Sequence, residues 1–95
     1  MKLSIIIPVH NEASTVHEVL EKVIAVPLQN IYKEIIVVDD GSTDGSDAVI
    51  REAQAALEHP VIVHTLAVNA GKGAAVRHGF RFATGDIILI QDADL

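Results

Sequence analysis

Two carboxylates one residue apart, Asp92 and Asp94, are the side chains of this sequence best suited to chemistry. They follow the apolar run Ile87–Ile90, which has the character of a buried strand. Alternate residues of an extended segment point the same way, so both carboxylates can reach one hard cation, Mg²⁺ or Mn²⁺, held against a diphosphate. The alternative is a pair of polar residues at a strand end. After so apolar a run, the metal interpretation is favoured.

A second acidic pair, Asp39 and Asp40, closes the apolar run Ile35–Val38 and precedes a turn-forming stretch, residues 41–46. A carboxylate beyond the second strand of an α/β fold often accepts hydrogen bonds from the ribose or base of a nucleotide. We assign that role to Asp40 and a structural role to Asp39. The alternative is turn chemistry alone, because Asp, Gly, Ser and Thr commonly form turns.

Two more loops carry candidate ligand groups. The segment Pro8–Glu12 follows the first apolar run and can hold another side of a nucleotide, although Asn11 is better explained as a helix N-cap. Lys72 can contact the nucleotide or its phosphates, or can be a solvated loop lysine. Its flanking glycines do not make a P-loop, which needs Gly-x-x-x-x-Gly-Lys-Ser/Thr, and no Gly-x-Gly-x-x-Gly dinucleotide motif follows the first strand.

Four predicted strands alternate with three amphipathic helices and position these loops. The strands are predicted over residues 3–9, 34–39, 61–68 and 86–90. The first helix is expected to start at Asn11 and end before Pro27, and the third to stop at Gly85. This βαβαβαβ order predicts an α/β fold with a Rossmann-like parallel sheet in one domain, residues 1–95. Ligands of such sheets bind beyond the carboxyl ends of the strands, where all four loops lie.

The composition excludes several classes of protein. The net charge of −6 argues against nucleic acid as a partner, because phosphate binding needs Lys and Arg clusters. Without cysteine there is no disulfide framework and no thiolate metal site, and a reducing cytoplasm is compatible. The five histidines lack His-x-x-x-His spacing, which disfavours zinc. No apolar run approaches the roughly 20 residues of a membrane span.

Taken together, four motifs resemble family 2 glycosyltransferases, with the nearest likeness to dolichyl-phosphate mannosyltransferase-like and polyprenyl-phosphate sugar transferases. The motifs are SIIIPVHNE (4–12), IIVVDDGSTD (35–44), NAGKG (69–73) and GDIILIQDADL (85–95). The resemblance covers the whole chain. It implies the N-terminal, donor-binding half of a nucleotide-diphospho-sugar transferase fold. The implied reaction transfers a sugar from a GDP- or UDP-sugar to an acceptor, with a polyprenyl phosphate as one candidate.

The resemblance also implies roles for individual residues. Asp92 and Asp94 would be the ligands of Mg²⁺ or Mn²⁺, and Val38 and Asp40 would contact the base and the ribose. The full implied nucleotide-sugar-binding set is Pro8, His10, Glu12, Val38, Asp40, Lys72, Asp92, Ala93 and Asp94. His10 departs from the family, which often has an aromatic residue at this position.

Family members continue well beyond the Asp-x-Asp motif, so the resemblance implies a truncated enzyme. We expect the acceptor site, the catalytic base and any membrane anchor outside these residues, and little transfer activity from the isolated chain. The expected location is the cytoplasm, at the cytoplasmic membrane face in a full-length form. The open fourth strand should invite self-association. A non-catalytic nucleotide-binding or regulatory module stays the alternative. A receiver-like domain is disfavoured, because the third strand ends in Val68-Asn69 and offers no acceptor Asp.

Overall fold

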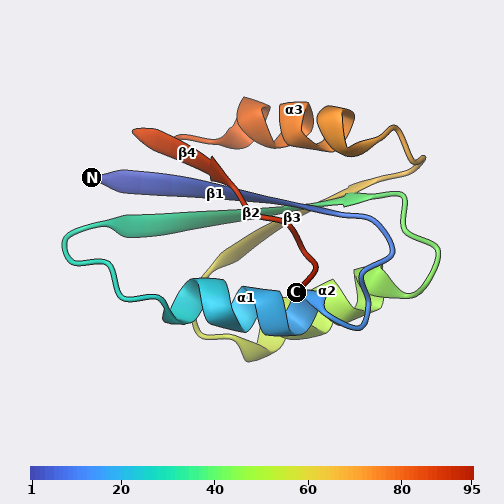
Figure 1. The fold of residues 1–95 in the computed structure, drawn as a ribbon, viewed down its shortest axis with the longest axis horizontal. Helices are drawn as coiled ribbons and strands as arrows, with labels where there is room; N and C mark the ends of the chain where they lie inside the picture. Colours follow the sequence, from blue (N-terminus) through green and yellow to red (C-terminus); the bar gives the residue numbers. More distant parts are fainter.

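Four parallel strands form one sheet with helices on both faces (Figure 1), as the alternating sequence pattern predicts. The computed structural model describes all 95 residues. In chain order the elements are β1 (Lys2–Val9), α1 (Val16–Ala25), β2 (Tyr32–Asp40), α2 (Ser46–Ala56), β3 (Val61–Leu66), α3 (Lys72–Phe82) and β4 (Ile87–Ile90). None of the three helices is long and apolar enough to cross a membrane.

The strand order β3-β2-β1-β4 places the switch in strand order at β1. From β1 the chain adds β2 and then β3 on one side, and afterwards returns to add β4 on the other side. In the register of the sheet, Ile5 lies beside Ile35 of β2 and Leu89 of β4. All four strands run in the same direction, so their carboxyl ends share one edge of the sheet, where ligands of α/β folds bind.

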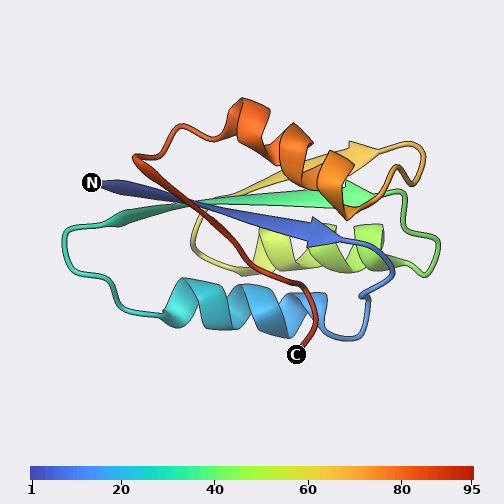
Figure 2. The same cartoon turned by 45° about the horizontal axis from the view of Figure 1, so that its top comes forward.

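The helices form two unequal layers around this sheet (Figure 2): α1 and α2 cover one face and α3 covers the other. Successive strand residues point to opposite faces, so Ile5 and Ile7 join the larger core under α1 and α2 while Ile6 faces α3. A Cβ atom on Gly79 of α3 would lie 2.6 Å from the Ile6 side chain. The close packing of α3 on β1 therefore requires a glycine at this position.

Two predicted helix ends are wrong. Asn11 is not the N-cap of α1, because it adopts a left-handed conformation with φ 53° and the helix begins only at Val16. An N-cap needs an extended backbone, which Asn11 does not have. Gly85 is not the stop of α3, which already ends at Phe82. A Cβ atom on Gly85 would lie 2.6 Å from the Ser4 hydroxyl, so close packing against β1 explains this glycine.

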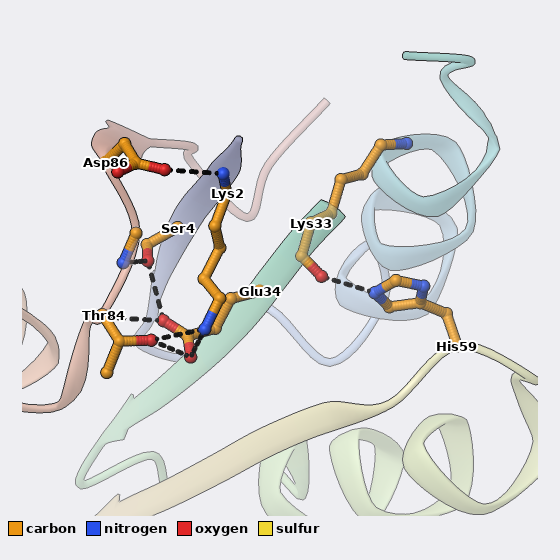
Figure 3. A network of polar contacts seen from close by, with 8 residues as sticks. Lys2, Ser4, Lys33, Glu34, His59, Thr84 and Asp86 are labelled. Carbon is orange, nitrogen blue, oxygen red and sulfur yellow. Dashed lines mark hydrogen bonds and ion pairs between the residues drawn. The ribbon is translucent and has the colours of Figure 1, made fainter. Parts of the chain in front are cut away.

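A buried lysine side chain caps the C-terminus of α1. Lys33 of β2 is 6% exposed, and its ammonium group donates hydrogen bonds to the carbonyl groups of Val23, Ile24 and Val26. These are the carbonyls that a helix leaves without partners at its C-terminus, where a positive charge is also favoured. In Figure 3 the Lys33 side chain extends from β2 toward the helix, and His59 contacts the Lys33 carbonyl oxygen at 2.7 Å.

The amino-terminal edge of the sheet is tied together by the carboxylate of Glu34 (Figure 3). Glu34 accepts hydrogen bonds from the Ser4 hydroxyl at 2.7 Å and from the backbone amide and hydroxyl of Thr84, each at 2.8 Å. Ser4 in turn accepts a hydrogen bond from the Gly85 amide, and Asp86 accepts one from the Lys2 amide. This network joins β1, β2 and the segment before β4, and it sets where β4 enters the sheet.

The outer edge of β4 has no strand beside it. Its four side chains, Ile87, Ile88, Leu89 and Ile90, are between 37% and 52% exposed, although all are aliphatic. Unpaired backbone with apolar side chains on both faces is a surface that favours pairing with another strand. The expected self-association through this edge stays a prediction.

Glu34→Gln should destabilise the protein by about 1–3 kcal/mol at neutral pH, because the Ser4 and Thr84 donors lose a charged acceptor. Burial alone would raise the pKa of Glu34, but the hydrogen bonds from Thr84 and Ser4 and the charge of Lys2 lower it below the ordinary 4.5. A carboxylate with a lowered folded pKa stabilises the fold above its unfolded pKa and loses that effect as pH falls through the folded pKa. The stability gap between wild type and variant, measured by urea unfolding, should therefore narrow below about pH 4.5.

The matched control is Glu18→Gln, which removes an exposed carboxylate on α1 that pairs with Lys22. It should change the unfolding free energy by less than about 0.5 kcal/mol at any pH. Equal pH profiles for the two variants would contradict the role given to Glu34.

Candidate functional site

A cleft of about 420 Å³ opens at the carboxyl edge of the sheet, across the switch in strand order. Residues that follow all four strands line it. They are Pro8, Val9, His10, Glu12, Asp40, Asn69, Gly71, Lys72, Ala75, Asp92, Ala93 and Asp94. The fold thus brings together every residue of the predicted nucleotide-sugar-binding set except Val38.

Val38 is the one predicted site residue that lies away from the cleft. Its side chain is fully buried and packs with Ile36 and Ala75 between β2 and α3. Val38 stands two residues before the end of β2, so α3 covers its side chain before the strand reaches the open edge. The Val38 side chain therefore belongs to the core, and a contact between Val38 and a base stays a prediction.

Asp40 lines the cleft but also has a structural role that the sequence assigned to Asp39. Its two carboxylate oxygens accept hydrogen bonds from the backbone amides of Ala70 and Gly71, at 2.8 and 2.9 Å. Only 2% of Asp40 is exposed. The carboxylate therefore fixes the loop that leads into α3 against the end of β2. Asp39, also buried, accepts a longer bond of 3.3 Å from the Ser42 amide.

Asn69 is a site residue that the sequence analysis did not select. Its side-chain amide donates to the Asp40 carbonyl oxygen at 3.3 Å and lies 2.8 Å from Nδ1 of His10, whose own ring is exposed. The backbones of Gly41 and Asn69 also lie close together, because a Cβ atom on Gly41 would stand 2.4 Å from the backbone nitrogen of Asn69. Asn69 opens the NAGKG motif, and the folded structure adds the contacts that bring its side chain to His10 and Asp40.

The turn after β2 supports the loop after β1. The Asn11 side-chain oxygen accepts a hydrogen bond from the Thr43 backbone amide at 2.8 Å, and the Asn11 backbone amide donates to the Ser42 hydroxyl. The Glu12 amide donates to the Ser46 hydroxyl at 3.0 Å. Turn chemistry therefore explains the Gly-Ser-Thr-Asp stretch, and the hydroxyls hold the segment that carries His10 and Glu12.

The acidic pair lies beside Lys72. The Lys72 ammonium group is 2.5 Å from a carboxylate oxygen of Asp92, and both side chains are more than half exposed. This hydrogen bond and the negative charge of Asp92 raise the pKa of Lys72, with a further contribution from Asp94. Between the two acids Ala93 is only 4% exposed and packs into the core. The carboxylates thus face the cleft from a segment that the core anchors.

The carboxylate oxygens of Asp92 and Asp94 suit a hard divalent cation whose remaining ligands come from a substrate and from water. No group of three or more His, Cys, Asp or Glu side chains is placed to hold a metal, so the chain offers Asp92 and Asp94 as a pair. Mg²⁺ is commonly bound by one or two carboxylates, with substrate phosphates and water completing its shell. The Lys72 ammonium group stands against Asp92, so a cation bound by the pair would have to displace it from that carboxylate.

The charges of the cleft also favour such an arrangement. Four carboxylates line it, those of Glu12, Asp40, Asp92 and Asp94, against the single ammonium group of Lys72. A nucleoside diphosphate would meet net repulsion in this cleft. A divalent cation held by Asp92 and Asp94 would reduce that repulsion.

The parallel sheet and its cleft place the chain among proteins with the fold of nucleotide-sugar transferases. One similar structure is the mannosyltransferase PcManGT from Pyrobaculum calidifontis in complex with GDP-Man and Mn²⁺. The two chains superpose with a TM-score of 0.83 and are 30% identical in sequence, and the match covers 97% of this chain and 27% of that one. Another is TarS from S. aureus in complex with UDP, which superposes with a TM-score of 0.81 at 29% sequence identity. This match covers 99% of this chain and 28% of that one.

The chain belongs to glycosyl transferase family 2, whose pattern it matches over residues 4–95. Among its relatives are the undecaprenyl-phosphate 4-deoxy-4-formamido-L-arabinose transferases of Sodalis glossinidius, 39% identical over 95 residues, and of Proteus mirabilis, 40% identical over 96 residues. Each alignment covers 99% of this chain and 29% of the relative. The chain therefore spans less than a third of the length of these relatives.

Asp40→Asn should destabilise the fold by about 1–3 kcal/mol, because the amide nitrogen of the new side chain would face a backbone N–H and leave one buried donor unpaired. Urea unfolding measures this change. Amide hydrogen exchange at Ala70 and Gly71 should also become faster, since these amides donate to Asp40.

The matched control for this variant is Asp47→Asn on α2, where the side chain is about half exposed. We expect it to change the unfolding free energy by no more than about 0.5 kcal/mol. Unaltered exchange at Ala70 and Gly71 in the Asp40→Asn protein would show that the carboxylate does not hold this loop.

Proposed function

We propose that this chain binds the donor of a glycosyltransferase reaction, a nucleoside diphosphate sugar together with Mg²⁺ or Mn²⁺. The observation that carries the proposal is the convergence of Asp92, Asp94 and Lys72 with the loops after β1 and β2 in one cleft. That similar structures are described in complexes with GDP-Man and Mn²⁺, or with UDP, supports the same class of ligand.

In this proposal Asp92 and Asp94 hold the cation from the protein side. The bound cation supplies charge neutralisation of the diphosphate that leaves when the sugar is transferred. Lys72 turns from Asp92 to a phosphate oxygen, because its flexible side chain reaches either partner. Pro8, His10, Glu12 and Asp40 line the same cleft and are proposed to border the nucleoside, with Ala93 next to the sugar.

The acceptor in this proposal is a lipid phosphate of the polyprenyl class. The names of the Sodalis and Proteus relatives, which are undecaprenyl-phosphate transferases, support this choice. Such an acceptor lies in a membrane, and in this proposal the reaction takes place at the cytoplasmic face. None of the residues in the cleft is assigned as the base that activates the acceptor, so the chain by itself is expected to bind donor without turning it over.

Calorimetric titration of the purified chain with GDP and with UDP, each with and without Mn²⁺, tests the donor site. We expect one of the two nucleotides to bind, and to do so only with the cation present. Asp92→Asn/Asp94→Asn should weaken this binding by at least about tenfold, because losing metal contacts commonly costs ten- to a hundredfold in affinity.

The matched control for the titration is Glu18→Gln/Asp47→Asn, which removes the same charge from exposed positions on α1 and α2, away from the cleft. It should bind as wild type does. If neither nucleotide binds to the folded wild-type chain, or if both double variants bind equally well, the proposed donor site is wrong.

Lys72→Met should have opposite effects on cation binding with and without nucleotide. Without nucleotide, Mn²⁺ affinity should rise about two- to fivefold, because the competing ammonium group is gone from Asp92. With UDP or GDP present, affinity should fall, because a phosphate contact is lost. Electron paramagnetic resonance of free Mn²⁺ measures both, with Lys22→Met as the control that leaves the cleft intact. A change in the same direction under both conditions would contradict a dual role for Lys72.

A further inference from the structure

The segment that carries the acidic pair is held by few contacts after β4 ends. The Gln91 amide donates to the Ile6 carbonyl oxygen at 2.9 Å, which continues the pairing with β1. Beyond that point the Ala93 side chain is buried in the core, and the Ala93 carbonyl oxygen accepts a hydrogen bond of 2.8 Å from the Thr15 hydroxyl. This carbonyl belongs to the peptide unit that joins Ala93 to Asp94, so its orientation sets the direction in which Asp94 leaves the core.

Thr15 stands at the N-cap of α1 and yet does not cap the helix. Thr is a favoured N-cap because its side-chain oxygen accepts a hydrogen bond from an amide of the first turn. Here the Thr15 side chain makes no such bond. Its hydroxyl proton is directed to Ala93, 78 residues further along the chain, and the only other acceptor near the hydroxyl is a Glu12 oxygen at 3.4 Å. The Thr15 hydroxyl thus makes a long-range contact to the acidic segment while its oxygen accepts no bond from the helix, and such departures from a local preference are typical of residues with a functional role.

Thr15 is itself held in place. Its amide donates to the Glu12 carbonyl oxygen at 3.1 Å, and the Val19 amide donates to the Thr15 carbonyl oxygen at 3.0 Å. The next residue, Val16, is fully buried. Because its backbone is anchored in this way, the Thr15 hydroxyl can hold the segment after β4 in a fixed position relative to the loop after β1. These two segments form two sides of the cleft.

We propose that Thr15 is a positioning residue that orients the Asp92–Asp94 segment for cation binding by its hydrogen bond to the Ala93 carbonyl group. The inference rests on the proposed function, since it assumes that this segment binds the cation. Thr15 touches neither substrate nor cation in this account and acts only through Ala93. Supporting groups of this kind commonly change metal affinity ten- to a hundredfold when they are removed.

The test compares Thr15→Val, which keeps the shape but lacks the hydroxyl, with Thr15→Ser, which keeps the hydroxyl. Mn²⁺ affinity in the presence of GDP or UDP should fall about tenfold in the Val variant and stay within about twofold of wild type in the Ser variant. In the absence of any ligand, amide exchange and ¹⁵N relaxation should show greater mobility at Asp94 and Leu95 in the Val variant only. The exchange of Val19 and Leu20 should be unchanged, because the hydroxyl does not cap α1.

Wild-type affinity and wild-type mobility in the Val variant would overturn the inference. It would also be overturned if Thr15→Val accelerated exchange along α1, because the hydroxyl would then serve the helix. The ligand-free mobility separates this inference from the proposed function. If wild type binds no nucleotide but the Val variant still loosens Asp94, the donor site is wrong while the hydrogen bond of Thr15 has the stated effect on the segment.

Discussion

Everything at the site depends on the position of β1 in the middle of the sheet. β1 pairs with β2 along eight residues and with β4 along four, so the carboxyl ends of three strands are fixed by backbone hydrogen bonds to a single buried segment. Between β1 and β4 the strand order reverses, which leaves space for a ligand beyond the strand ends. Because the pairing is parallel throughout, the loops after β1, β2 and β4 arrive at one edge without any further adjustment.

The loops at this edge are stabilised mainly by polar contacts. Asp40 holds the Ala70 and Gly71 amides, Asn11 holds the Thr43 amide, and Thr15 holds the Ala93 carbonyl group. Loops leave the backbone without the ladder bonds of a sheet, and side chains with short polar groups supply the missing partners. Hydrogen bonds are directional, so they restrain the loop geometry more tightly than apolar contacts of the same strength would. A site for a cation and a diphosphate needs such restraint, because its ligand distances vary little.

Much of the fold can be predicted from the sequence, because four apolar runs alternate with helical periodicity and each run has the length of a strand. The predicted acidic pair, His10, Glu12 and Lys72 do line one cleft. The sequence could not indicate that Asn11 would adopt a left-handed conformation, since Asn serves N-caps and turns equally well. It could not place Val38 under α3 either, because burial there depends on the packing of Ala75 and Gly79. The structural role that Asp40 has in addition to lining the cleft likewise follows from the path of the loop before α3, about 30 residues away.

Ala93 belongs to two structures at once: it is a member of the main hydrophobic core and the residue between the two acids. The acidic segment is therefore part of the cooperative unit of the domain, although it lies at a surface and beyond the last strand. A side chain larger than methyl at this position would crowd the core and shift both carboxylates together. The geometry of the acidic pair is consequently inherited from the packing of α1 on the sheet. A change in that packing would therefore misalign the Asp92 and Asp94 carboxylates at the cleft well before the protein unfolded.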